Sequence, residues 1–236
     1  MSYYRSYFEK NNTVIKNSQT NTAKNPTTEI FYGSGFSKFI FKVDFTSLLE
    51  KVSGGDYVID SNTTHKLHLT NTIFGDETFL GAKRGTGRER TTSFSLIIFK
   101  LTESWDEGVG FDYEDGEYDY TTGNDTYDKR PSNWFNRTTA DTWSQEGIYS
   151  NNPTILDTIE FDNGNENLVA DITQYVNGIV VNGDVDYGIG VAFATEYEEL
   201  DQEVDQSVAF FSKYTQTFFE PYVETYFDDK IRDDRD

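Results

Sequence analysis

Hydrophobic and polar residues alternate along residues 38–45 of the chain. The apolar positions on one side are Phe39, Phe41, Val43 and Phe45. A period of two places successive side chains on opposite faces of a strand, so this segment predicts a β-strand with one buried face. The residues that follow, 46–51, predict a short helical turn with a hydroxyl cap, which Gly54 and Gly55 end.

Further short segments predict more strands. Residues 65–69 alternate, with Leu67 and Leu69 facing inward, and residues 94–101 form the most apolar run of the chain. Because that run is short and rich in β-branched and aromatic residues, we expect it to be a central strand. The later segments predict strands at 158–161, 187–193, 207–212 and 221–227, and the segment 168–173 precedes one helical turn at 174–180.

The sum of these segments predicts an all-β protein of about eight to ten strands. With no internal repeat and no proline-rich linker in 236 residues, one domain is expected. We therefore expect a jelly-roll-like β-sandwich at residues 29–227, with long acidic loops and short helical turns. A polar N-terminal arm at 1–28 and a charged tail at 228–236 would flank it, and an edge strand or a frayed end are the alternatives for the arm.

Composition narrows the class of partner. The net charge of −21 repels the phosphates of nucleic acids and of anionic membranes. No stretch approaches the roughly 18 apolar residues of a membrane span, and no apolar signal core follows Met1. The absence of cysteine excludes disulfide scaffolds and thiolate zinc sites. We expect no nucleic acid and no membrane as partner, and synthesis in a host cytoplasm without a signal peptide.

Six features occur in a characteristic order. They are an Asn-Thr segment at 21–25 before the strand and turn at 38–48, the strand at 66–69, the run 96–101 that leads into Trp105-Asp106-Glu107-Gly108 with Trp134 beyond it, and the segments 169–176, 186–191 and 221–224. In this order the chain resembles the jelly-roll modules of the DNRLRE type and related structural proteins of tailed bacteriophages. The resemblance covers residues 21–226.

The resemblance implies a jelly-roll fold, but it is less specific for function, because jelly rolls host many roles. The long acidic loop at 112–142 and the charged end after Tyr226 depart from the family. With the lack of a signal peptide, these departures favour a phage particle over a secreted carbohydrate-binding module. The implied function is a virion structural protein of the tail, neck, fibre or capsid surface. It would act in multiple copies, through contacts with other virion proteins and with itself.

Three tryptophans, Trp105, Trp134 and Trp143, are the candidates for glycan binding. Exposed indole rings could stack on sugars, which would make the chain a carbohydrate-binding module that contributes to adsorption to a host surface. The alternative is that the three rings are buried and close the ends of the sandwich, as most tryptophans are largely buried.

Acidic residues in the long loop are the candidates for a calcium site. They are Asp112, Glu114, Asp115, Glu117 and Asp119. Calcium prefers carboxylate and carbonyl oxygens, but the spacing does not match an EF-hand, and acidic runs are usually solvated. A second acidic run at 196–205 has the same two interpretations. No other cofactor is expected.

Basic residues gather in one glycine-rich loop of this acidic chain. Lys83, Arg84, Arg88 and Arg90 could dock onto an acidic patch of a neighbouring subunit, including another copy of the chain. The alternative is a surface loop whose charge only offsets the acidic background.

No catalytic motif stands out. The chain has no Gly-x-Ser-x-Gly elbow and no phosphate loop, and its acidic residues are too abundant to single out a glycosidase pair. His65 and His68 fall on opposite faces of a strand, so they cannot easily share a metal. We expect no enzymatic activity, with a polysaccharide-degrading enzyme as the least favoured alternative.

Overall fold

The computed structural model describes residues 2–72, 93–111, 131–149, 152–198, 200 and 206–228, together with the backbone of Glu89–Arg90. Its fold is an all-β, sandwich-like architecture, as the alternating segments predict. The strands are β1 (Ser2–Ile15), β2 (Thr27–Tyr32), β3 (Ser37–Val43), β4 (Thr64–Leu69), β5 (Glu89–Arg90), β6 (Phe94–Lys100), β7 (Ile155–Phe161), β8 (Leu168–Asp171), β9 (Ile189–Phe193), β10 (Gln206–Phe211) and β11 (Tyr222–Phe227). The helices are α1 (Thr46–Ser53), α2 (Thr173–Val180) and the short 3-10 helix η1 (Thr195–Tyr197).

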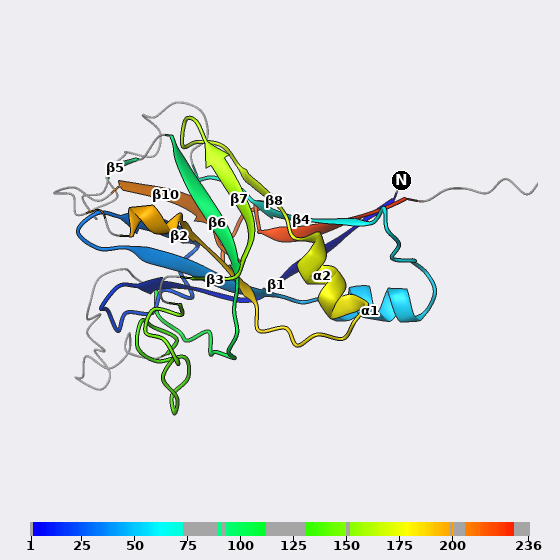
Figure 1. The fold of residues 1–236 in the computed structure, drawn as a ribbon, viewed down its shortest axis with the longest axis horizontal. Coiled ribbons are helices and arrows are strands. Elements are labelled where there is room, and N and C mark those ends of the chain that lie inside the picture. Colours follow the sequence, from blue (N-terminus) through cyan, green and yellow to red (C-terminus); the bar gives the residue numbers. More distant parts are fainter. Residues whose placement is uncertain are drawn as a thin grey trace, which may run out of the picture.

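Eight of these strands form one large sheet in the order β7-β6-β9-β3-β1-β11-β4-β8 (Figure 1). Every neighbouring pair in it is antiparallel. The two outermost strands, β7 and β8, lie in contact, so the sheet curls until it is nearly a barrel. A second, smaller sheet in the order β2-β10-β5 packs against β3 and β9.

Strand β1 joins the two halves of the large sheet. Residues 2–7 pair with β11, and residues 8–15 pair with β3. The register shifts between Phe8 and Lys10, at the point where the partner changes, and such a bulge bends a strand. Residues 2–15 of the expected polar arm (1–28) therefore lie inside the large sheet, and Asn11 and Asn12 are fully buried.

Strand β3 is buried on both faces, not on one as its alternation predicts. Phe39 and Phe41 lie on one face, while Lys38 and Ile40 lie on the other, and all four are fully buried. The second face is buried because residues 131–149 pack over it, with the Lys38 ammonium donating a hydrogen bond to the Gly147 carbonyl at 3.1 Å.

The predicted strands at 65–69 and 94–101 are present as β4 and β6, and β6 is flanked by β7 and β9. The predicted helical turn after β3 is present as α1, but it has no hydroxyl cap. Instead, the Asp44 carboxylate accepts a hydrogen bond from the backbone N–H of Thr46 at 2.9 Å. The helix ends at Gly54, and Gly55 follows with a φ of 82°, a conformation that favours glycine.

Candidate functional site

The three tryptophans lie in the hydrophobic core. Trp105, Trp134 and Trp143 are 2%, 7% and 4% exposed. The indole N–H of Trp105 donates to the Tyr187 carbonyl at 2.9 Å, and that of Trp143 donates to the Asn133 carbonyl at 2.8 Å. Indole rings with satisfied N–H groups and buried faces pack the protein and present no platform to a sugar.

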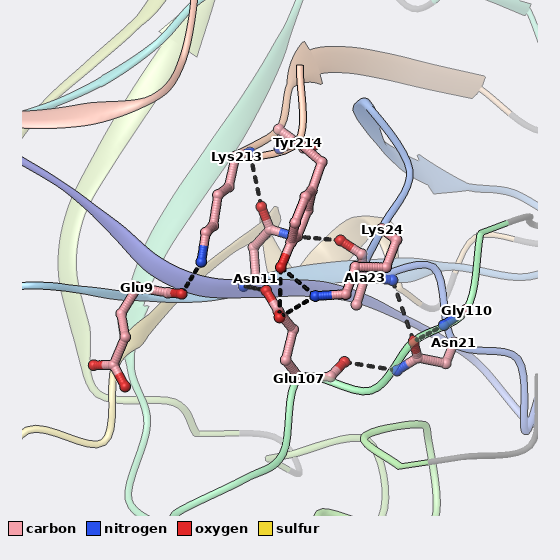
Figure 2. A network of polar contacts seen from close by, with 10 residues as sticks. Glu9, Asn11, Asn21, Ala23, Lys24, Glu107, Gly110, Lys213 and Tyr214 are labelled. Atoms are coloured by element: carbon pink, nitrogen blue, oxygen red, sulfur yellow. Dashed lines mark hydrogen bonds and ion pairs between the residues drawn. The ribbon is translucent and has the colours of Figure 1, made fainter. Parts of the chain in front are cut away.

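Loops pack over the second half of β1, residues 8–15, and we call this part of the molecule the covered side. A polar network ties these loops to one another and to β1 (Figure 2). The Asn21 side chain donates to the carbonyls of Glu107 and Ser132, both at 2.9 Å. Its oxygen accepts from the backbone N–H of Gly110 at 2.8 Å and of Ala23 at 3.3 Å. One fully buried amide therefore satisfies backbone groups from three loops, which explains why a polar residue occupies the interior here.

Three side chains at the rim of this network point toward one another in Figure 2. The Lys24 ammonium lies 2.6 Å from a Glu107 carboxylate oxygen and also contacts the Tyr214 hydroxyl, which donates to Glu107 at 2.7 Å. Burial would lower the pKa of Lys24, but the hydrogen bonds to Glu107 and Tyr214 outweigh it and raise that pKa. The lysine therefore stays charged beside the Glu107 carboxylate, which suits a latch between loops rather than proton transfer.

A second cluster surrounds Lys38, whose side chain is 1% exposed. Its ammonium lies 3.3 Å from the centre of the Tyr149 ring and 3.4 Å from a Glu198 carboxylate oxygen. Desolvation by burial lowers the pKa of Lys38 to about 8, against the opposing effect of Glu198. The pKa of Tyr149 is raised, first by burial and then by Glu198.

The two histidines lie on opposite faces of β4, as their spacing predicts. The His65 ring is buried, with its nitrogens 2.8 Å from the Thr225 hydroxyl and 3.2 Å from the Asn177 side-chain oxygen. Burial lowers the pKa of His65 to about 4, so this ring is neutral at pH 7. His68 faces outward, where it stacks on Tyr222.

The outward face of β1, β11, β4 and β8 carries a cluster that we call the tyrosine face. Its members are Tyr3, Arg5 and Tyr7 of β1, Tyr222, Glu224 and Tyr226 of β11, Lys66 and His68 of β4, and Val169 and Asp171 of β8. Tyr3 and Tyr7 are 59% and 45% exposed, whereas Ser6 and Phe8 on the opposite side of β1 are buried.

Planar groups on the tyrosine face stand against one another. The His68 ring is stacked on Tyr222 with centroids 4.8 Å apart, and the Arg5 guanidinium lies 4.4 Å from the centre of the same ring. These two groups come from β4 and β1, the strands that flank β11. A tyrosine ring already packed against two planar side chains suits hydrogen bonding to a protein better than stacking on a sugar.

Charge is balanced on the tyrosine face. Two basic residues, Arg5 and Lys66, face two acidic residues, Glu224 and Asp171, and Arg5 donates to Glu224 at 2.8 Å. Burial would raise the pKa of Glu224, but hydrogen bonds from Tyr226 and Arg5 outweigh it and lower that pKa. The face is thus neutral at pH 7 within a chain of net charge −21.

The remaining candidate residues fall outside the description of the structure. Asp112, Asp115, Glu117 and Asp119, the expected calcium ligands, lie outside the described residues, as do Lys83, Arg84 and Arg88 of the basic cluster. For Arg90, only the backbone is described, and it pairs with Ser207 of β10. In the part of the chain that the structure describes, no group of three or more histidine, aspartate or glutamate side chains could hold a metal, and no helix is long and apolar enough to cross a membrane.

The comparisons with known proteins leave the chain without an assigned family. No protein-family model matches it, and no curated protein matches it.

The sequence analysis does not single out the tyrosine face, Lys38 or Asn21 as candidate functional residues. A signal for the first was present, since Tyr3, Arg5 and Tyr7 alternate with Tyr4, Ser6 and Phe8. Alternation of this kind, rich in tyrosine and phenylalanine, is typical of a strand. For Lys38 and Asn21 the sequence carries no such signal, because the loops that bury them, with Glu107 and Gly147, lie more than 80 residues away along the chain.

Proposed function

We propose that this chain is a structural protein of a tailed-phage particle that acts in multiple copies through protein–protein contacts. The observation that carries the proposal is the tyrosine face, an exposed and charge-balanced surface on an otherwise acidic protein. Its tyrosine and arginine side chains belong to the residue types that protein interfaces favour. The all-β sandwich and the resemblance to phage jelly-roll proteins support the same role, in a tail, neck, fibre or capsid surface.

The balance of charge favours contact between copies. Two molecules of net charge −21 repel each other at long range, and this repulsion is weakest where the approaching surfaces are neutral. On the tyrosine face, Lys66 of one copy can lie opposite Asp171 of another, while Arg5 and the buried Glu224 stay paired within each copy. An isologous arrangement of this kind makes each favourable contact twice.

Light scattering across a range of protein concentrations tests the proposal. We expect a discrete oligomer that the variant Arg5→Glu, which adds like charge to both sides of the contact, converts to monomer. Val181→Ser, at a residue that is 60% exposed on another surface, is the matched control and should leave the mass unchanged.

A second arm decides between copies of the chain and other virion proteins. If the wild type is a monomer, its binding to purified particle proteins of the phage that encodes it should be weakened by Arg5→Glu and not by Val181→Ser. A monomer that binds none of them would overturn the proposal. An oligomer that is insensitive to Arg5→Glu would show that another surface makes the contact, and the assignment to the tyrosine face would be wrong.

A further inference from the structure

The Lys38 amine lies in a closed site of aromatic rings. Besides the Tyr149 ring at 3.3 Å, the rings of Phe36 and Trp134 have their centres 5.2 Å and 5.6 Å from the amine nitrogen. Lys38 is among the largest fully buried side chains of the described residues. A lysine in such a position is unusual, because burial of a charged ammonium costs free energy that one ion pair repays only with excellent geometry.

The geometry of the Lys38–Glu198 pair is not that of a strong ion pair. The nearest nitrogen–oxygen distance is 3.4 Å, longer than the roughly 2.7–2.9 Å of a charge-assisted hydrogen bond. The amine donates instead to the Gly147 carbonyl at 3.1 Å. The Glu198 oxygen nearest the amine accepts a hydrogen bond from the Tyr149 hydroxyl at 2.7 Å. Amine and carboxyl are therefore each held by a separate partner, side by side.

The amine can reach the protonation state that the reaction requires. With its pKa near 8, the buried Lys38 ammonium is a stronger acid than an exposed lysine. Transfer of one proton from the ammonium to the Glu198 carboxylate gives a neutral amine and a carboxylic acid. This transfer removes two charges from a site of low polarity, where charged groups are disfavoured.

We propose that Lys38 and Glu198 condense to form an intramolecular amide bond. The amine nitrogen attacks the carboxyl carbon Cδ, a nitrogen–carbon bond forms, and one carbon–oxygen bond breaks. The departing hydroxyl takes a proton from the nitrogen and leaves as water, so the step needs no oxidant, reductant or co-reactant. The Tyr149 hydroxyl stabilises the charge that develops on the carboxyl oxygen, and the Gly147 carbonyl orients the amine.

Proximity accelerates a reaction that is slow between free amines and carboxylic acids. Groups fixed side by side in a folded protein react with effective concentrations far above any in solution. The product would link β3 to the segment that follows η1, two places separated by 160 positions along the chain, 198 minus 38. It would also remove the buried charge that makes Lys38 unfavourable as a free side chain.

Intact-mass spectrometry of the full chain under denaturing conditions tests the proposal. We expect a mass below that of the sequence by about 18 Da, the mass of one water, and a proteolytic fragment in which Lys38 and Glu198 are joined. Lys38→Met keeps the volume of the side chain, and Glu198→Ala removes the carboxyl, and both should have the full mass of their sequences. Lys42→Arg, a change on the same strand, is the matched control and should keep the deficit.

A time course after refolding separates this chemistry from ordinary packing. Tyr149→Phe keeps the ring but removes the hydroxyl, so the deficit should develop at least about tenfold more slowly. A folded wild-type protein that keeps the full mass after prolonged incubation near pH 9 would overturn the proposal. A deficit that persists in Lys38→Met would overturn it as well, because the lost water would then come from another place.

Discussion

The two halves of β1 reverse the usual relation between polarity and burial. The first half carries Tyr3 and Tyr7 on an exposed face, whereas the second half buries Asn11 and Asn12 completely. The difference lies in what covers each half. Loops pack over the second half and bring backbone N–H and carbonyl groups that need partners, and asparagine side chains supply both donors and acceptors. On the first half, the face that carries Tyr3 and Tyr7 keeps its aromatic side chains at the surface.

Among the substitutions that test this difference, the largest loss of stability is expected at Asn21, on the covered side. Asn21→Ala removes four hydrogen bonds. Three backbone groups lose their side-chain partner, while the Ser132 carbonyl keeps its bond from Asn12. At about 1 kcal/mol for each hydrogen bond, the free energy of unfolding should fall by about 4 kcal/mol. Urea denaturation measures the change. Asn62→Ala, at an exposed asparagine, is the control and should change the value by less than about 0.5 kcal/mol.

The two histidines of β4, one buried and one facing outward, allow a buried and an exposed environment to be compared through the pH dependence of stability. Burial lowers the pKa of His65 to about 4, below its value of about 6.5 in an unfolded chain. Between these two pH values the unfolded state binds more protons than the folded state. The contribution of His65 to the free energy of unfolding is therefore complete above pH 6.5 and is lost as the pH falls toward 4. The loss should reach at most about 3 kcal/mol.

Denaturation at several pH values, with His65→Gln and His68→Gln beside the wild type, checks this expectation. The slope of the free energy of unfolding against pH, between about pH 6.5 and pH 4, should become flatter in the His65 variant. The change in slope should be smaller in the His68 variant, because that ring lies on the exposed side. Equal slopes in the wild type and the His65 variant would contradict the assignment of the pH dependence to His65.

The latch at the rim of the covered side should have an intermediate effect. Tyr214→Phe removes the hydroxyl that donates to Glu107 but keeps the ring beside Lys24. The Glu107 carboxylate retains its bonds to Lys24 and to the Asn11 backbone, so the free energy of unfolding should fall by only about 1 kcal/mol. Thermal unfolding measures it. A loss as large as that of Asn21→Ala would show that the latch is part of the core network.

The smallest effect on stability is expected on the tyrosine face. Tyr7→Ser should change the free energy of unfolding by less than about 1 kcal/mol, since its ring is 45% exposed and mainly touches Tyr222. The same variant should weaken self-association by at least about tenfold, if the face is the interface. A large loss of stability with unchanged association would assign Tyr7 to the fold and not to binding.

The sequence predicts those strands in which the pattern of apolar and polar residues matches the pattern of burial. The segment 65–69 alternates because β4 buries one face, and the segment 94–101 is almost continuously apolar because most of β6 is buried. It does not predict burial that distant loops impose. Asn12 bonds to Ser132, and Lys38 bonds to Gly147, and neither contact follows from local periodicity. The buried positions of the tryptophans and the second covered face of β3 likewise depend on where residues 131–149 pack.

The pairing of β1 with β11 has a consequence for how the molecule is made. Ser2 lies opposite Phe227, so β1 leaves the ribosome before all the other strands of this sheet and waits for β11, which follows them all, before the middle of the large sheet can close. Until then, β1 and β4 each lack a neighbour, and their unpaired edges are open to other nascent chains. Sheets completed by such distant pairing form slowly. We therefore expect the yield of folded protein to depend on chaperones and on the rate of translation more than its final stability would suggest.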